Sequence, residues 1–261
     1  MTPPARFGDL GYHLEESLID ATELEELRDV VEEVAERVKF RALRDGAGPE
    51  HQLGDGHRIQ FSSRAGIQWE WAEGSQEIRL IEPVDHLHAR FAALFDDPRL
   101  TGPVHRALGV DALAPFTSKL NLKRAREGSE FPWHQDYPYW YVATGERAAE
   151  IVTAIVFLDD ATRDNGAVRV LPGSHRSGSA RRNPLDPTHF LTDPAGLDTD
   201  REVVLEVPAG SVLWFDAFLV HRSSPNVSGH HRRALLPSWQ PAGRPRLHDL
   251  AYVPERVHDL P

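Results

Sequence analysis

Apolar residues recur at helical spacing in the first part of the chain and alternate with polar residues in the second part. After Asp20, the apolar positions Leu24, Leu27 and Val31 lie three or four residues apart, which predicts a helix that ends at about Phe40. Asp20 is a suitable cap, because a short acidic side chain can accept a hydrogen bond from a free amide of the first helical turn. The same spacing predicts two more helices, at 83–95 and 100–108.

The remainder of the first 110 residues shows less regular patterning. Residues 11–14 are typical of a short strand. Residues 41–80 are rich in Gly, Asp, Arg and His, and we expect most of them to form loops. Trp69 and Trp71 are the exception, because residues two positions apart lie on the same face of a strand.

Strand patterns dominate the chain after Gly109. Residues 116–123 alternate, so that Thr117, Lys119, Asn121 and Lys123 share one face. For Lys123 we expect a solvated position on that face. Further strands are predicted at 150–158, 167–171, 202–206, 211–215 and 232–239. The glycine-containing turns between them, at 164–166, 172–174 and 208–210, have an architectural role in this interpretation.

Helices first and many short strands later predict a mainly β protein with a helical cover. The 261 residues fit a single domain, 1–261. Within it we expect a mostly helical cover at 1–110, a β core at 111–240 and a surface tail at 241–261.

The composition narrows the classes of function. The chain has 29 Lys and Arg residues against 40 Asp and Glu residues, a net charge of −11, so that no basic surface is expected for nucleic acid or an anionic membrane. It has no cysteine, which excludes disulfides and thiol nucleophiles. No apolar run reaches the roughly 20 residues that span a bilayer. No secretory segment follows Met1, and no obligate protein partner is indicated, so we expect a cytoplasmic enzyme.

His134 and Asp136 are two positions apart, and His221 follows much later. In an extended segment both His134 and Asp136 can reach one ion. Two imidazoles and one carboxylate form the facial triad that holds non-haem Fe(II) and leaves positions open for O2 and a co-substrate. In a chain with 14 histidines, this spacing alone is a weak signal.

Several other motifs strengthen the prediction of a metal site at His134, Asp136 and His221. They are Glu130–Asp136 (EFPWHQD), Asp164–Ala167 (DNGA), Leu171–His175 (LPGSH), His221–Asn226 (HRSSPN) and Arg232–Leu235 (RRAL). In order and spacing they resemble the phytanoyl-CoA dioxygenase family, which includes ectoine hydroxylase-like enzymes. The resemblance covers roughly residues 110–240.

The resemblance implies a double-stranded β-helix, or cupin-like jelly roll, in which His134, Asp136 and His221 bind Fe(II). It also bears on the reaction, because related halogenases have a small residue where this chain has Asp136. A carboxylate at this position favours hydroxylation or another two-electron oxidation over halogenation.

The resemblance further implies that 2-oxoglutarate is the co-substrate, with Arg232 and the Ser223 hydroxyl on its distal carboxylate and Asn121 as a further contact. A guanidinium suits a carboxylate because its planar fork can donate two charge-assisted hydrogen bonds. Arg233 is the adjacent competitor, and strand alternation would place only one of the two arginines inside.

Substrate contacts are expected from the same face and from the aromatic residues around the metal motif. Trp140 matches a substrate-contacting position of ectoine hydroxylase-like enzymes. Phe131 and Tyr137 flank the motif, and Lys119 and Thr117 would point to the substrate side of the cavity. For Lys119, as for Asn121, a solvated strand face is an equally good interpretation.

The function expected from these observations is Fe(II)- and 2-oxoglutarate-dependent oxidation of a small organic metabolite or natural-product intermediate, which consumes O2 and releases succinate and CO2. A cupin-like isomerase or epimerase is an alternative, although it would give Arg232 and Ser223 no role. A catalytically silent metal-binding sensor is another. A coenzyme A thioester is not expected, because no basic cluster is available for its phosphates.

Overall fold

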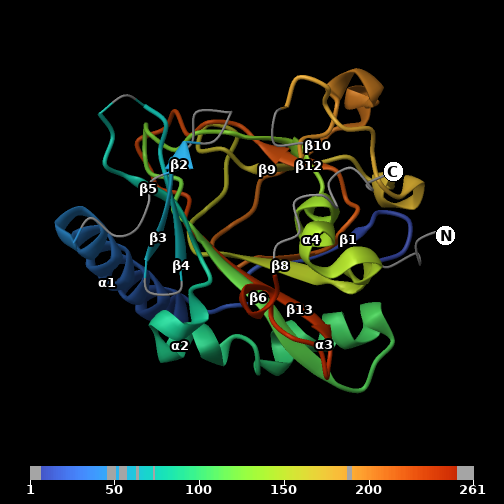
Figure 1. The fold of residues 1–261 in the computed structure, drawn as a ribbon, viewed down its shortest axis with the longest axis horizontal. Coiled ribbons are helices and arrows are strands. Elements are labelled where there is room, and N and C mark those ends of the chain that lie inside the picture. Colours follow the sequence, from blue (N-terminus) through green and yellow to red (C-terminus); the bar gives the residue numbers. More distant parts are fainter. Residues whose placement is uncertain are drawn as a thin grey trace.

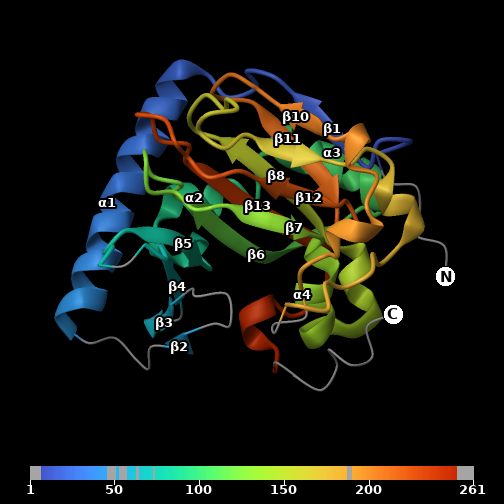
Figure 2. The same cartoon turned by 90° about the horizontal axis from the view of Figure 1, so that it is seen from above.

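Two antiparallel sheets face each other in the computed structural model of the chain (Figures 1 and 2). The structure describes residues 7–45, 51–52, 58–62, 65–72, 74–186 and 190–251. The large sheet has nine described strands in the order β1-β11-β8-β13-β6-β5-β4-β3-β2, and the small sheet has four in the order β10-β9-β12-β7. The predicted double-stranded β-helix is confirmed.

The strands and helices have the following bounds. The large sheet contains β1 (Tyr12–Glu15), β2 (His51–Gln52), β3 (Arg58–Ser62), β4 (Ala65–Trp69), β5 (Ile78–Glu82), β6 (Leu113–Asn121), β8 (Val152–Phe157), β11 (Val212–Asp216) and β13 (Ala234–Pro241). The small sheet contains β7 (Phe131–His134), β9 (Val168–Val170), β10 (Val203–Leu205) and β12 (His221–Ser223). The α-helices are α1 (Ala21–Asp45), α2 (Ala89–Ala93), α3 (Pro98–Leu108) and α4 (Asp136–Thr144).

The central strands of the large sheet are apolar on both faces, because each face has a layer to cover it. On β11, Val212 and Trp214 belong to the core between the sheet and the helices, whereas Leu213 and Phe215 belong to the core between the sheets. This alternation makes the strand hydrophobic throughout its length. At roughly 1.5–3 kcal/mol for each large apolar side chain buried, the two cores are the main stabilising contribution to the fold.

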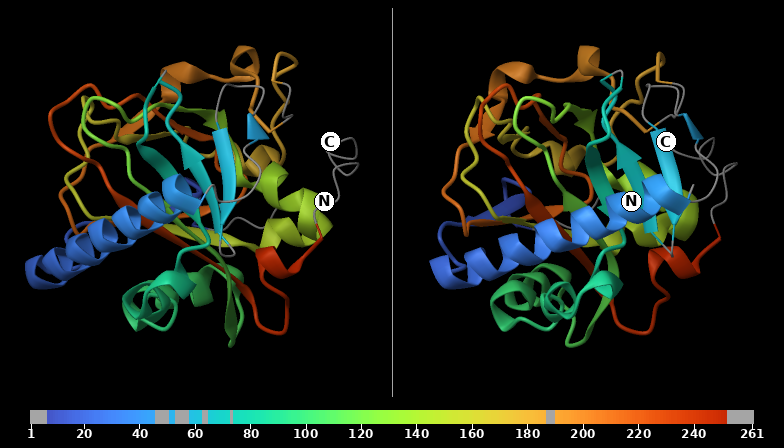
Figure 3. Two further views of the ribbon diagram at one scale, coloured as in Figure 1. Left: turned by 60° about the vertical axis from the view of Figure 1, so that its left-hand side comes forward. Right: turned by 90° about the vertical axis from the view of Figure 1, so that its left-hand side faces the viewer.

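Helices α1, α2 and α3 cover the outer face of the large sheet, and α1 runs along it (Figure 3), whereas α4 belongs to a separate cluster of buried residues. As predicted, Asp20 caps α1, since its carboxylate accepts a hydrogen bond of 2.9 Å from the Glu23 amide. Two tryptophans of the sheet are pinned to this layer. The indole of Trp214 donates to the carbonyl of Leu100 at 3.0 Å, and that of Trp239 donates to the carbonyl of Phe95 at 3.2 Å. No described helix has both the length and the apolar character needed to cross a membrane.

The expectation of loops at 41–80 is wrong. The described residues there include β3, β4 and most of β5, which extend the large sheet beyond β6, so that the region 1–110 supplies strands as well as helices. Strand β3 does alternate polar and apolar residues, but it has only five residues and its aromatic Phe61 is exposed, so the pattern is a weak signal. Trp69 ends β4, and Trp71 lies beyond the strand.

Three further boundaries differ from prediction. The helix expected at 83–95 is a single 3-10 turn followed by α2, because His88 is extended between them. Helix α4 was not predicted, since Tyr, Trp and Pro138 are poor helix formers. Strand β6 ends at Asn121, and Lys123 has a positive φ of 28° that turns the chain away from the sheet. Of the tail at 241–261, residues 252–261 lie outside the described part.

The turn before β11 yields a test of the packing between the sheet and the start of α1. Gly210 has a φ of +85°, and a Cβ there would lie 2.3 Å from the Ile19 carbonyl oxygen. Gly210→Ala should therefore lower the free energy of unfolding by about 2–4 kcal/mol. Gly243 has a similar φ of +83° with open space around it, so Gly243→Ala should cost only about 1–2 kcal/mol. Equal losses in urea unfolding would show that the close approach to Ile19 carries no energetic cost.

Candidate metal and co-substrate site

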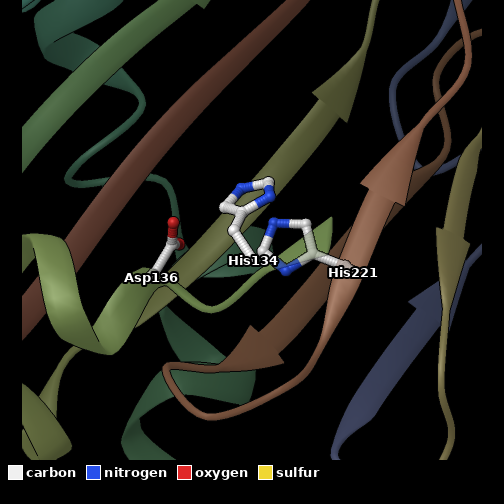
Figure 4. Close-up of side chains that lie close together, drawn as sticks. All are labelled: His134, Asp136 and His221. Atoms are coloured by element: carbon white, nitrogen blue, oxygen red, sulfur yellow. The ribbon is translucent and has the colours of Figure 1, made fainter. Parts of the chain in front are cut away.

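Three metal-ligating side chains converge between the two sheets (Figure 4). His134 ends β7, Asp136 begins α4 and His221 begins β12. The pairing of β7 with β12 sets His134 directly opposite His221, and their ring centroids are 4.1 Å apart. One ligand atom from each of the three residues lies within 4.8 Å of the others. A single ion placed among them would be held by two imidazoles and one carboxylate.

Gln135 explains why the two ligands on either side of it turn inward. Its side chain points the opposite way and is buried. The amide donates to the carbonyls of Phe218 (2.6 Å) and Gly178 (2.9 Å), and its oxygen accepts from the Ala180 amide (2.8 Å). The backbone of Gln135 is extended and Asp136 is the first helical residue. Asp136 therefore reaches the site from a helix start, not from the strand expected for it.

Both histidines are held in the form that a metal requires. The Nδ1 atom of His134 lies 2.7 Å from the carbonyl oxygen of Pro132, and that of His221 lies 3.0 Å from the carbonyl oxygen of Leu219. Since a carbonyl only accepts, Nδ1 carries the proton and Nε2 keeps its lone pair. Burial, together with the neighbouring His221, holds the pKa of His134 well below its ordinary value, and burial lowers the pKa of His221. Neutral imidazoles and a buried carboxylate fit a divalent metal ion.

A cavity of about 70 Å³ adjoins the three ligands. Its lining brings together the three ligands, all three residues predicted for the co-substrate, two of those predicted for the substrate, and several apolar side chains. They are Lys119, Asn121, Phe131, His134, Asp136, His221, Ser223, Arg232, Leu80, Ile155 and Phe215. The sequence motifs that lie far apart in the chain thus meet at one enclosed site.

Arg232 is the unusual charge in this cavity. It is 2% exposed, and its guanidinium has no hydrogen bond or ion pair with any residue of the described ranges. Burial lowers the pKa of Arg232 to about 10, so that the side chain remains a cation near neutral pH. A buried cation without a partner is costly, and an anion bound in the cavity would compensate it. The buried Oδ1 atom of Asn121 also has no hydrogen-bond partner within the described part of the chain.

Arg233 points the other way. It donates to the carboxylate of Asp159 at 2.7 and 2.9 Å and to that of Glu32 at 2.8 Å. These bonds tie the start of β13 to α1. Of the two adjacent arginines, Arg232 is the one that faces the cavity.

The residues expected to contact a substrate do not all lie at one pocket: Lys119 lines the metal cavity, and Thr117 lines a second pocket. Lys119 is half-buried at the cavity, and its ammonium lies 5.8 Å from the ring centroid of Trp140. Burial acts to lower the pKa of Lys119, but the carboxylates of Glu82 and Asp136 outweigh it, so the pKa is raised. Thr117 donates to Glu82 at 2.7 Å. A second pocket, of about 230 Å³, is lined by Thr117, Glu82, Leu80, Gln68 and Phe61 among others.

Trp140 and Tyr137 belong to an aromatic cluster around α4. Trp140 packs edge-on against Phe116 with centroids 5.6 Å apart, and Tyr137 stacks on Phe218 at 4.2 Å. Neither side chain lines the two pockets described above. Burial, with help from Glu146, raises the pKa of Tyr137, which keeps its phenol protonated.

Two residues of the site were missed in the sequence. Glu82 had no visible motif, although its strand continues the face of Thr117 and Lys119. Lys123 was expected in solvent, but it is 1% exposed and donates a hydrogen bond of 2.9 Å to Ser223. That expectation is wrong because the chain leaves the strand after Asn121 and carries Lys123 inward. The rarity of lysine, with only three in the chain, was the available signal.

The buried histidines predict a pH dependence of the metal-free protein. In the unfolded chain His134 and His221 take up protons near pH 6.5, whereas the folded state resists protonation because both pKa values are lowered. Their stabilisation is thus present above about pH 6.5 and is lost as the pH falls toward the folded pKa values. The free energy of unfolding should decrease from pH 7.5 to pH 5, and less steeply in His134→Gln/His221→Gln. Identical slopes in urea unfolding would contradict neutral buried imidazoles.

Comparison with known proteins agrees with this geometry. The phytanoyl-CoA dioxygenase (PhyH) family profile matches residues 7–234. L-proline trans-4-hydroxylase of Streptomyces griseoviridis is 30% identical over 182 residues, which cover 63% of this chain and 68% of that protein. An ectoine dioxygenase of Bordetella parapertussis is 30% identical over 169 residues, which cover 59% of this chain and 54% of the relative. The match therefore spans only about half the length of that relative.

A solved structure extends the likeness to the fold. EctD from S. alaskensis, with 2-oxoglutarate and 5-hydroxyectoine, superimposes with a TM-score of 0.65 and 26% identity. The likeness covers 91% of this chain and 74% of that one. Since the family profile covers most of the sequence and the jelly roll encloses the expected triad, this chain belongs to the phytanoyl-CoA dioxygenase family.

Proposed function

We propose that this protein is an Fe(II)- and 2-oxoglutarate-dependent oxygenase that oxidises a small organic metabolite. The observation that carries the proposal is the buried Arg232, which has no partner among the residues that the structure describes and lies in the same cavity as the triad of His134, Asp136 and His221. A metal alone would explain the triad, but it would leave Arg232 without a counter-ion. A co-substrate that joins a metal-chelating 2-oxo acid to a second carboxylate accounts for both.

The residues of the chain have distinct tasks in this proposal. The two neutral imidazoles and Asp136 hold the ion, and the carbonyls that accept from each Nδ1 fix the ring orientations. Arg232 and Ser223 bind the distal carboxylate of 2-oxoglutarate. When bound, Fe(II) with 2-oxoglutarate supplies the activation of O2 that yields succinate, CO2 and an oxidised substrate. Asp136, as a third protein ligand, supports hydroxylation or a comparable two-electron oxidation.

Apolar and aromatic side chains keep the reacting centre dry. Phe215 packs edge-on against the His221 ring at 4.9 Å, and Tyr139 does the same against His134 at 6.0 Å. Ile155 and Leu80 close further parts of the cavity. Exclusion of water strengthens the charge interactions inside and prevents side reactions.

The second pocket supports a small, charged substrate. It shares Leu80 with the metal cavity, and strand pairing puts its residues on one face: Gly66 is opposite Glu82, and Leu80 is opposite Asn121. Lys119 and Glu82 place opposite charges along this face. The relatives named above act on L-proline and on ectoine, which are small molecules, and this favours a free metabolite over a coenzyme A thioester. A cytoplasmic location and the absence of nucleic-acid and obligate protein partners remain predictions.

The proposal predicts a charge-transfer complex and turnover. Anaerobic addition of Fe(II) and 2-oxoglutarate to the metal-free protein should produce the weak visible metal-to-ligand absorption band, and admission of O2 should release succinate. His134→Ala, Asp136→Ala and His221→Ala should each abolish succinate release. A folded protein that binds Fe(II) but gives no band would favour the isomerase or sensor alternative, and an active Asp136→Ala hydroxylase would contradict the ligand assignment.

The adjacent arginines form a matched pair for testing the co-substrate site. Arg232→Ala should weaken 2-oxoglutarate affinity by roughly 10- to 100-fold, because it removes a charge-assisted pair. Arg233→Ala should leave that affinity unchanged and lower the melting temperature instead, since it breaks the bonds to Asp159 and Glu32. Titration of the absorption band and a thermal melt separate the two effects. The reverse result would mean that the inward-facing arginine has been misassigned.

A further inference from the structure

Lys123 is a buried lysine that the proposed reaction does not yet use. It is 1% exposed and lies just past β6 with a φ of +28°. Two glycines leave room for its side chain. A Cβ at Gly166 would lie 2.2 Å from the Lys123 Cε, and one at Gly128 would lie 2.6 Å from its Cγ. Burying a long basic side chain between these glycines costs folding free energy. The contacts of Lys123 indicate which role could justify that cost.

The ammonium of Lys123 reaches the wall of the metal cavity. Its Nζ donates to the Ser223 hydroxyl oxygen and to the carbonyl oxygen of Ser129, both at 2.9 Å. It also lies 5.3 Å from the centroid of the Phe131 ring. Because an ammonium has only donors, the Ser223 oxygen must accept this bond. The hydroxyl hydrogen of Ser223 is then left to be donated to another acceptor.

The backbone of Lys123 holds the other half of the predicted carboxylate site. Its carbonyl oxygen accepts a hydrogen bond of 3.2 Å from the amide of Arg232 and one of 3.0 Å from the side chain of Asn226. One residue thus contacts both Ser223, through its side chain, and Arg232, through its main chain. Displacing Lys123 would disturb both groups together.

The charges around Lys123 favour an anion. Burial is the largest influence that holds the pKa of Lys123 well below its ordinary value, followed by the cations Arg232 and Arg79, while the carboxylates of Glu70 and Glu130 oppose them. Of these carboxylates only Glu70 is buried, whereas the basic side chains of Lys123, Arg79 and Arg232 are all buried. A carboxylate brought into the cavity would offset the excess positive charge.

We propose that Lys123 is a positioning residue for the distal carboxylate of 2-oxoglutarate: by donating to Ser223 and anchoring the backbone of Arg232, it directs the serine hydroxyl hydrogen and the guanidinium toward that carboxylate. This inference rests on the proposed function, since it concerns the same co-substrate. It adds a requirement for one end of the ligand only. The hydrogen bonds of the Lys123 side chain go to Ser129 and Ser223, not to the three metal-ligating residues that would hold the 2-oxo and C1-carboxylate end.

Two 2-oxo acids distinguish binding of the distal carboxylate from binding of the metal-chelating end. 2-Oxovalerate has the five-carbon skeleton of 2-oxoglutarate, with a methyl group in place of the distal carboxylate. Dissociation constants for both acids are measured anaerobically with Fe(II), from the metal-to-ligand absorption band, in the wild-type protein and in Lys123→Met. We expect the substitution to weaken 2-oxoglutarate by about tenfold or more and to leave 2-oxovalerate within about twofold. Preference for 2-oxoglutarate should fall by the same factor.

Two further variants guard against a purely structural effect. Ser223→Ala keeps the packed lysine and removes the hydroxyl that it positions, so it should show the same selective loss, and the double variant should lose less than the product of the two single losses. Lys39→Met is the matched control, because Lys39 pairs with Glu77 at 2.6 Å and does not line the metal cavity. It should bind both acids as the wild type does.

The outcomes distinguish this inference from the function on which it rests. If the wild-type protein forms no absorbing complex with 2-oxoglutarate, the proposed function fails and the inference fails with it. If the wild type forms the complex but Lys123→Met or Ser223→Ala keeps the wild-type preference for 2-oxoglutarate, only the role of Lys123 is wrong. If Lys123→Met weakened the binding of both acids equally, Lys123 would have only a packing role.

Discussion

The antiparallel pairing of β7 with β12 is the constraint on which the site depends. It sets His134 opposite His221, and both strands are short, so a slip of one residue would turn these side chains to the other face. The pairing of β12 with β9, which sets His221 opposite Val170, opposes such a slip because Val170 is fully buried. Apolar packing between the sheets therefore fixes the strand register, and the register fixes the geometry of the triad.

The charges of the site are arranged around the same framework. At one end of the cavity, Arg232 and Lys123 lie buried with too few carboxylates to match them. Elsewhere at the cavity, Glu82 and Asp136 both act on Lys119. Meanwhile Arg233, one position from Arg232, is fully paired with Asp159 and Glu32. Neighbouring arginines thus have opposite roles, one stabilising the scaffold and the other left for a ligand.

The sequence was most informative where chemistry and local periodicity agreed. The separation of His134 and Asp136, the distant His221 and the adjacent arginines predicted a candidate site, and the structure brings the three ligands and Arg232 together in one cavity. The capped helix after Asp20 and the strands after Gly109 were also predictable, because each follows a regular hydrophobic period.

Other features depend on contacts that no local pattern records. Strands β3 to β5 were missed because each has only five residues and the segment 41–80 around them is rich in Gly, Asp, Arg and His, so that pairing beyond β6 is needed to select the extended form. Helix α4 is built from aromatic residues that favour it through packing, not propensity. Lys123 was misplaced because the strand period was continued two residues too far, past the point where the backbone turns.

Lys119 interacts electrostatically with both Glu82 and Asp136, so a metal held by Asp136 and an anion bound at Lys119 would be thermodynamically dependent on each other. A cation held by Asp136 would offset part of the negative field that the carboxylate exerts on Lys119, which makes the ammonium free to attract an anionic group. Linkage requires the reverse effect to be equal: an anion bound at Lys119 would tighten the hold of the triad on its metal. If the substrate carries an anionic group that binds Lys119, the ion would be retained most firmly when that substrate is present.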